Sequence, residues 1–125
     1  MPARRRIPAA RAREAVRAWA SDPAAADRSA TALAVRGALE ELAARVPGSS
    51  VEVRVPPFGV AQCVEGPRHT RGTPPNVVET DAATWLALVT GSLGWDDALA
   101  RGLVSASGQR AALGEHLPLF PSAPS

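Results

Sequence analysis

Several residue types are scarce or missing in this chain of 125 residues, and each absence narrows what the protein can be. Cys63 is the only cysteine, so no internal disulfide can form, as is typical of proteins from a reducing compartment. No apolar run approaches the roughly 18–20 residues that span a bilayer, and the N-terminus lacks the apolar stretch of a signal peptide. We therefore expect a cytoplasmic protein without integral membrane association. Aromatic residues make up only 4%, so the core must consist mainly of Ala, Val and Leu.

Lysine is absent, and the arginines that replace it are unevenly spread. Positions 1–17 carry six arginines against the single acid Glu14, although the net charge of the whole chain is only +2. A basic terminus of this kind either contacts nucleic acid or anionic lipid, or is simply solvated. No aromatic residues alternate with these arginines and no nucleic-acid-binding motif is present, so we expect no nucleic-acid partner. We interpret residues 1–8 as a flexible basic arm.

The length suits one domain with one core, which we place at residues 9–120, followed by a disordered tail at 121–125. Apolar residues at helical spacing predict helices at about 9–20 and 29–46. In the second helix, Arg36 with Glu40 and Glu41 with Arg45 are one turn apart and can pair on an exposed face.

Residues 51–55 alternate apolar and polar side chains, which predicts a strand with one buried face. Pro56–Gly59 has turn chemistry, and 60–64 is then expected to return as the second strand of a hairpin. The remaining pattern predicts a strand at 76–79, helices at 81–89 and 95–101, a strand at 103–107 and a short helix at 111–115.

Three consecutive segments of the chain each end in glycine. Thr84–Gly91 joins an aromatic residue to an apolar run that ends in glycine, Trp95–Gly102 is a short alanine-containing helix that ends in glycine, and Leu103–Gly108 is a strand that ends in glycine. In order and spacing they resemble the sterol carrier protein family, also called the type-2 sterol carrier domain. Residues 65–81 are similar to a bacterial branch of that family. Similar domains also occur fused to enzymes that use the thiol mycothiol.

This resemblance implies an α+β fold of one domain, in which helices cover a mainly antiparallel sheet of about five strands. An apolar tunnel would lie between the sheet and the helices. The sequence pattern shows four clear strands, so one strand is not accounted for. Because family members bind sterols, fatty acyl chains and other lipids, the resemblance implies a non-catalytic carrier of a lipid or other small apolar ligand.

Such a tunnel needs apolar walls, because each unpaired polar group buried there costs about 1–3 kcal/mol. The candidate lining residues are Val53, Val55, Val60, Trp85, Val89, Trp95, Leu99 and Val104. The alternative is that these residues fill an ordinary packed core. Near the C-terminus, Leu117, Leu119 and Phe120 either cap the mouth of the tunnel or pack as a strap over the sheet.

The best polar candidates are Arg68, His69 and Arg71, in a loop rich in glycine and proline. Two guanidinium groups and an imidazole so close together suit a carboxylate or phosphate head group, or an acidic protein partner. The alternative is a solvated connection. A partner at this loop would favour a second function: a protein-protein interaction or accessory module with a collapsed groove, for example one that serves a thiol-dependent enzyme.

The sequence offers no arrangement for catalysis. Cys63 is expected in the middle of a strand, away from a helix N-terminus that would lower its pKa, and no third group orients it with His69. His69 and His116 are far apart in the sequence, and one cysteine completes no metal-ligand set. We therefore expect no enzyme activity, no metal and no cofactor.

Overall fold

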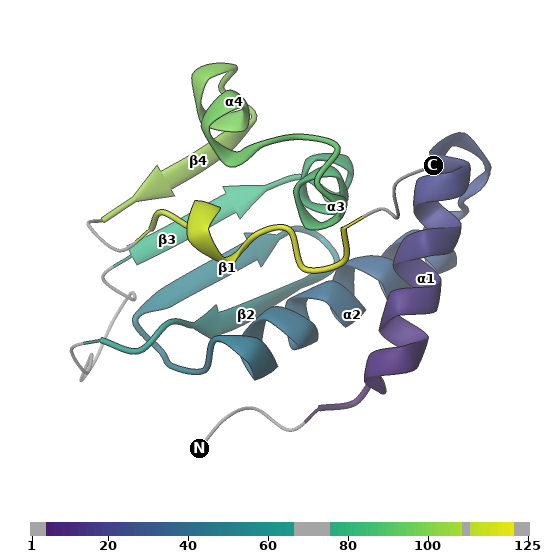
Figure 1. The fold of residues 1–125 in the computed structure, drawn as a ribbon, viewed down its shortest axis with the longest axis horizontal. Coiled ribbons are helices and arrows are strands. Elements are labelled where there is room, and N and C mark those ends of the chain that lie inside the picture. The colour runs from purple at the N-terminus through teal and green to yellow at the C-terminus, as the bar shows by residue number, and fades with distance from the viewer. Residues whose placement is uncertain (1–4, 67–75, 109–110, 122–125) are drawn as a thin grey trace.

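The computed structural model describes residues 5–66, 76–108 and 111–121, and within these ranges the chain forms four α-helices and four β-strands (Figure 1). The helices are α1 (Ala9–Ser21), α2 (Arg28–Arg45), α3 (Ala82–Thr90) and α4 (Trp95–Ala100). The strands are β1 (Val51–Val55), β2 (Gly59–Cys63), β3 (Asn76–Thr80) and β4 (Val104–Ser107). Two short 3-10 helices, η1 (Pro23–Ala25) and η2 (Gly114–His116), complete the order, so the short helix expected at 111–115 is a single 3-10 turn. None of the helices in the described part is long and apolar enough to cross a membrane.

Local sequence signals account for where α2 and α3 begin. The side chain of Asp27 accepts a hydrogen bond from the Ala30 N–H at 2.8 Å, and the side chain of Asp81 accepts one from the Thr84 N–H at 2.7 Å. Each carboxylate satisfies an N–H group that has no partner within its helix. Gly91 ends α3 with a φ of 83°, a left-handed conformation that glycine adopts without steric cost.

The four described strands form one mixed sheet in the order β2-β1-β3-β4. The predicted hairpin is confirmed, because β1 and β2 pair antiparallel with Val53 opposite Ala61. Strands β3 and β4 also pair antiparallel, whereas β1 and β3 run parallel. The described chain thus differs from the expected sheet of about five strands in having four, and one of its three pairings is parallel. Alternation within a strand shows which face is buried but not which strand lies beside it, so the sequence could not predict this order.

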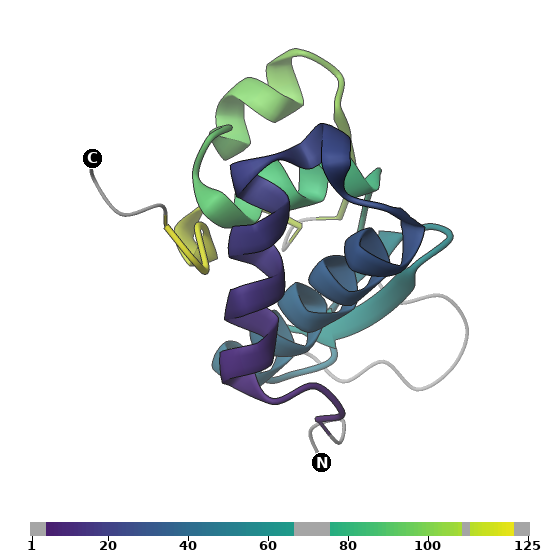
Figure 2. The ribbon, with the colours of Figure 1, turned by 90° about the vertical axis from the view of Figure 1, so that its right-hand side faces the viewer.

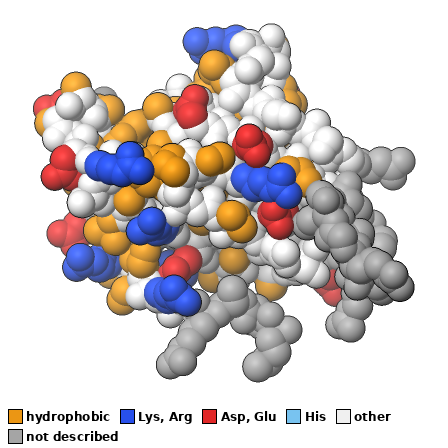
Figure 3. Space-filling view, turned by 180° about the vertical axis from the view of Figure 1, so that it is seen from behind, with side chains coloured by type: hydrophobic (Ala, Val, Ile, Leu, Met, Phe, Trp, Pro, Cys, Tyr) orange, Lys and Arg blue, Asp and Glu red, His pale blue; other side chains and the backbone are white. Residues whose placement is uncertain are grey.

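The helices lie on one side of the sheet, and no described helix covers the other side (Figure 2). In β1 the residues Val51, Val53 and Val55 are buried, while Glu52 and Arg54 lie on the opposite face, where they form an ion pair. Seen from this side, the surface mixes hydrophobic side chains with arginines and acids (Figure 3). The core therefore lies between the sheet and the layer of helices.

The C-terminal segment, residues 111–120, crosses the sheet on its helical side (Figure 1). We call it the C-terminal strap. Leu119 and Phe120 are buried, and both of their backbone N–H groups donate to the Val89 carbonyl at 3.0 Å. The Phe120 ring also lies between two guanidinium groups, with its centroid 6.0 Å from Cζ of Arg13 and 5.3 Å from Cζ of Arg45. Of the two interpretations of this segment, the structure shows the strap.

Candidate functional site

Most of the apolar residues that the sequence placed around a tunnel belong to the packed core. Those with 8% of their surface exposed or less are Val53, Val55, Trp85, Val89, Trp95 and Val104. Val60 and Leu99 depart from the prediction, because they are 61% and 40% exposed. The reason at Val60 is register. Val60 pairs with Arg54, whose side chain lies on the face of β1 away from the core, so Val60 also faces away from the core.

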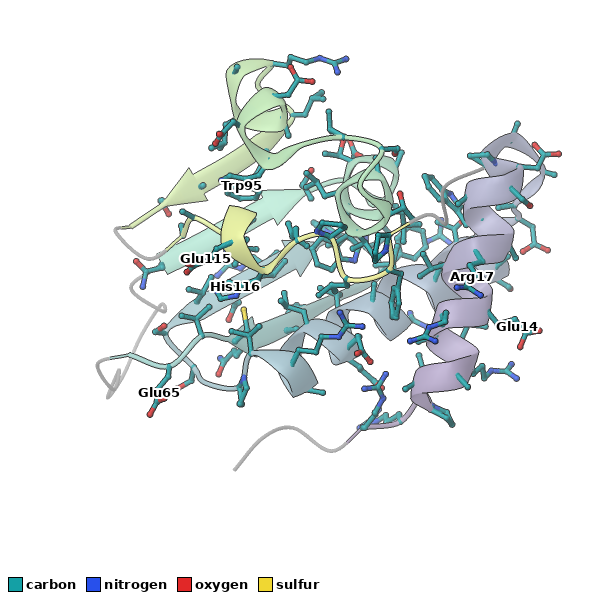
Figure 4. All side chains as sticks on the ribbon, in the orientation of Figure 1. Glu14, Arg17, Glu65, Trp95, Glu115 and His116 are labelled. Atoms are coloured by element: carbon teal, nitrogen blue, oxygen red, sulfur yellow. The ribbon has the colours of Figure 1, made fainter. Side chains whose placement is uncertain are left out.

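Trp95 and Trp85 both pack against other segments of the protein. A Cβ atom added to Gly114 of the C-terminal strap would lie 3.1 Å from the Trp95 side chain, so the strap backbone already touches the indole. Figure 4 shows Trp95 close to the segment that carries Glu115 and His116. The Trp85 ring is buried, and its Nε1–H donates to the Val35 carbonyl at 3.4 Å. Both rings therefore contact other parts of the protein.

An open cleft lies elsewhere, between α2 and the edge strand β2. Its volume is about 910 Å³. The floor comes from one side of α2 and includes Leu39, Ala43 and Ala44, and the facing wall is residues 59–62 of β2. Residues 5–7 of the N-terminal segment form a further wall. Val60 is the one predicted lining residue that also lines this cleft, which it borders from the edge strand β2.

Two glutamates of α2 hold the N-terminal wall in place. The Oε1 atom of Glu40 accepts hydrogen bonds from the backbone N–H groups of Arg6 at 2.9 Å and Ile7 at 2.8 Å. Arg5 forms an ion pair with Glu41, with 2.7 Å between its Nη2 and Oε1 of the carboxylate. Residues 5–7, which the sequence assigned to a basic arm, therefore lie against α2 and shape the cleft.

Near the cleft, the carboxylate of Glu41 is largely buried and paired with two arginines. It is only 8% exposed and forms ion pairs with both Arg5 and Arg45. Burial by itself raises the pKa of Glu41, but the hydrogen bonds and charges of Arg45 and Arg5 outweigh it, so the pKa lies below its usual value. The predicted pairing of Glu41 with Arg45 is confirmed, whereas Glu40 binds backbone N–H groups in place of Arg36.

Of the loop and thiol candidates from the sequence, only Cys63 lies within the described residues. Arg68, His69 and Arg71 lie outside the described residues. Cys63 is fully buried at the end of β2, and burial raises the pKa of its thiol to about 12. In the described ranges, no group of three or more His, Cys, Asp or Glu residues is placed to hold a metal ion. Among the described residues, the lining of the cleft consists of apolar side chains together with arginines, Glu40 and Gln62.

The burial of Cys63 predicts slow chemical modification of the native protein. At pH 8 we expect iodoacetamide to label native Cys63 at least about tenfold more slowly than the urea-unfolded chain, because the thiolate is the reactive form. Mass spectrometry of quenched samples measures both rates. Equal rates in the two states would show that the thiol is accessible and ionises normally.

Comparison with known proteins agrees with the resemblance seen in the sequence. Residues 27–119 match a family described as bacterial SCP ortholog, where SCP stands for sterol carrier protein. The chain belongs to this bacterial sterol carrier protein family. The family match begins just before α2 and therefore includes the floor of the cleft and β2, but residues 5–7 and α1 precede it. No curated protein matches the chain.

Alternation and helical spacing in the sequence could not reveal the cleft. Ala43 and Ala44 give no signal of binding in the sequence, because small residues are frequent in any helix. The run of arginines before α1 was visible, but its attachment to α2 depends on Glu40 and Glu41, which are more than thirty positions away. A site assembled from three distant segments of chain becomes visible only after they pack.

Proposed function

We propose that this protein binds a lipid or another small apolar ligand in the cleft between α2 and β2, and that it acts as a carrier without catalysing a reaction. Membership of the bacterial sterol carrier protein family supports the carrier role. The observation that carries the proposal is the cleft itself, whose volume of about 910 Å³ is that of a typical small-molecule site.

Binding in this cleft would rest on desolvation. An apolar chain laid along Ala43, Ala44 and Phe58 removes its own surface and theirs from water, which contributes about 25 cal/mol per Å² of apolar surface buried. The cleft is open to solvent along one side, so a ligand enters and leaves without local unfolding. Rapid exchange of this kind suits a carrier better than a storage protein.

Filling the cleft with a large side chain tests the proposal. Ala44 is exposed on α2 and lines the cleft, so Ala44→Trp places an indole in the binding space at little cost to the core. We expect the affinity for the neutral dye Nile red to fall about tenfold or more, which corresponds to a loss of about 1.4 kcal/mol. The dye's fluorescence, which increases in apolar surroundings, reports binding.

Ala18→Trp is the matched control. Ala18 is also an exposed helical alanine, but it lies on α1. It lines neither this cleft nor a smaller cleft between α1 and α2. Its affinity for the dye should equal that of the wild type. If Ala44→Trp and Ala18→Trp bind the dye equally well, the ligand site lies outside the α2–β2 cleft.

The alternative function, an interaction or accessory module, is supported by the burial of Trp85 and Trp95 and by the contact of the C-terminal strap with Trp95. The same titration separates the two functions. An interaction module without a ligand site predicts that the wild type does not bind Nile red, or any acyl ligand that competes with it. Saturable binding by the wild type that Ala44→Trp abolishes would favour the carrier.

A further inference from the structure

A second, smaller cleft adjoins the first. Its volume is about 470 Å³, and it lies between the start of α1 and the first half of α2. The residues that line it are Ile7, Arg11, Ser29, Ala30, Ala32, Leu33 and Arg36. Ile7 and Arg36 also line the α2–β2 cleft, so the two spaces meet at these side chains. The two clefts are therefore neighbours, and a ligand would have to pass over these two side chains to occupy both.

The second cleft is cationic. Arg11 and Arg36 line it, and none of the described residues that line it is acidic. The Nε of Arg36 donates to the Phe58 carbonyl at 2.7 Å, which holds the guanidinium group where the clefts meet and leaves its two terminal nitrogens available. Arg11 and the Ser29 hydroxyl have no hydrogen-bond or ion-pair partner in the described chain. Guanidinium and hydroxyl groups in this arrangement suit a carboxylate or phosphate.

The main cleft also has a positive rim. Arg5, Arg6 and Arg36 line it together with one acid, Glu40. The Oε1 atom of Glu40 already accepts two backbone N–H groups, which offset part of its negative charge. The main cleft thus has an apolar floor on α2, whereas the second cleft, near α1, is lined by two arginines. The two clefts therefore suit different parts of a ligand.

The second cleft depends in part on residues that precede the family match. Ile7 and Arg11 come before residue 27, where that match begins. We infer that this N-terminal extension adds an anion-binding subsite at Arg11 and Arg36. The favoured ligand is then an amphiphile whose apolar chain lies in the α2–β2 cleft and whose carboxylate or phosphate head lies in the second cleft. The inference rests on the proposed function, because it needs the apolar chain to occupy the main cleft.

The test compares two ligands that differ only in head-group charge. Dodecanoate and dodecan-1-ol are used to displace Nile red at pH 8 and low ionic strength, both below the concentrations at which they aggregate. The wild type should bind dodecanoate more tightly. Arg11→Gln and Arg36→Gln should each reduce that preference by about three- to tenfold and leave the affinity for dodecan-1-ol unchanged. Because Arg36 also holds the Phe58 carbonyl, Arg11→Gln is the cleaner variant.

Arg17→Gln is the matched control, since Arg17 is exposed on α1 and lines neither cleft (Figure 4). It removes the same charge and should keep the full preference for dodecanoate. An equal loss in Arg17→Gln and Arg11→Gln would overturn the subsite, because it would reflect only the long-range attraction of a basic helix. Equal affinities of the wild type for the two ligands would overturn the inference while leaving the proposed function intact. Failure of Nile red to bind at all would refute both.

Inorganic phosphate distinguishes a head group from a free anion. Phosphate and chloride are compared as added salts at matched ionic strength, because both screen exposed charges equally. An amphiphile site predicts the same small reduction in dodecanoate affinity with either salt. A much larger reduction with phosphate would show that the second cleft binds the free anion independently of an attached chain, and would overturn the inference.

Discussion

Gly37→Ala should destabilise the folded protein by about 2–3 kcal/mol, as overpacking at a tight contact does. Helix propensity alone would predict that this substitution stabilises the protein, because alanine in a helix interior is favoured over glycine by about 1 kcal/mol. A Cβ atom at Gly37 would lie 2.8 Å from Cβ and 3.1 Å from Cα of Ala12, where α1 and α2 touch. Ala12 and Val16 of α1 are fully buried, so α1 cannot move away without exposing its apolar side.

Urea unfolding followed by circular dichroism measures this effect, and a double-mutant cycle assigns it to the contact. Ala12→Gly removes the opposing methyl group, so it should recover much of the stability in the Gly37→Ala background while destabilising the wild type. Gly94→Ala is the control, since a Cβ there meets nothing within 4 Å. A Gly37→Ala protein as stable as the wild type would mean that α1 and α2 do not pack this closely in solution.

Glu41→Gln should lower the free energy of unfolding by about 1–3 kcal/mol at pH 7, because it leaves Arg5 and Arg45 without their shared counter-charge in a largely buried place. The same substitution should also change how stability depends on pH. The pKa of Glu41 is lowered in the folded state, so its contribution is present above the usual value of 4.5. That contribution is lost as the pH falls from about 5 towards the lowered pKa of the folded state.

Urea midpoints between pH 3 and pH 7 check both parts of this prediction. The stability difference between the wild type and Glu41→Gln should be largest at pH 7 and shrink as the pH falls below about 4.5. Glu14→Gln is the control, because Glu14 is exposed on α1 and forms no ion pair among the described residues (Figure 4). A difference that stays constant across this range would show that the carboxylate charge of Glu41 is not what stabilises the fold.

This prediction also bears on the cleft. The ion pair of Arg5 with Glu41 and the bonds from Glu40 hold residues 5–7 against α2. Those residues form a wall of the main cleft, and Ile7 lines the second cleft as well. The electrostatics of two adjacent glutamates therefore determine the shape of a space whose floor is apolar.

Much of the fold could be predicted from local patterns in the sequence. Alternation in residues 51–55 predicts strand β1 and its buried side, and Asp81 with Gly91 predicts where α3 begins and ends. The glycine-ended segments between Thr84 and Gly108 led to the family, and the family match confirms it. The strand and the two ends of α3 each depend on residues within about ten positions of one another, and short-range backbone preferences act over that distance.

Errors appeared where distant segments meet. Val60 was placed on the buried face because a shift of one residue in a strand reverses every side chain, and only the pairing with β1 determines that shift. Trp85 and Trp95 are buried in the core, and their sequence positions do not show that the C-terminal strap packs against Trp95.

The periodicity and chemistry of neighbouring residues were enough to predict the helices, the strands, the two ends of α3 and the family. The parallel pairing of β3 with β1, the contact of the C-terminal strap with Trp95 and the cleft between α2 and β2 became visible only in the folded chain. The physical reason is that burial and charge pairing act between segments far apart in the chain. The cleft depends on how residues 5–7, α2 and β2 pack together, and no local pattern records that packing.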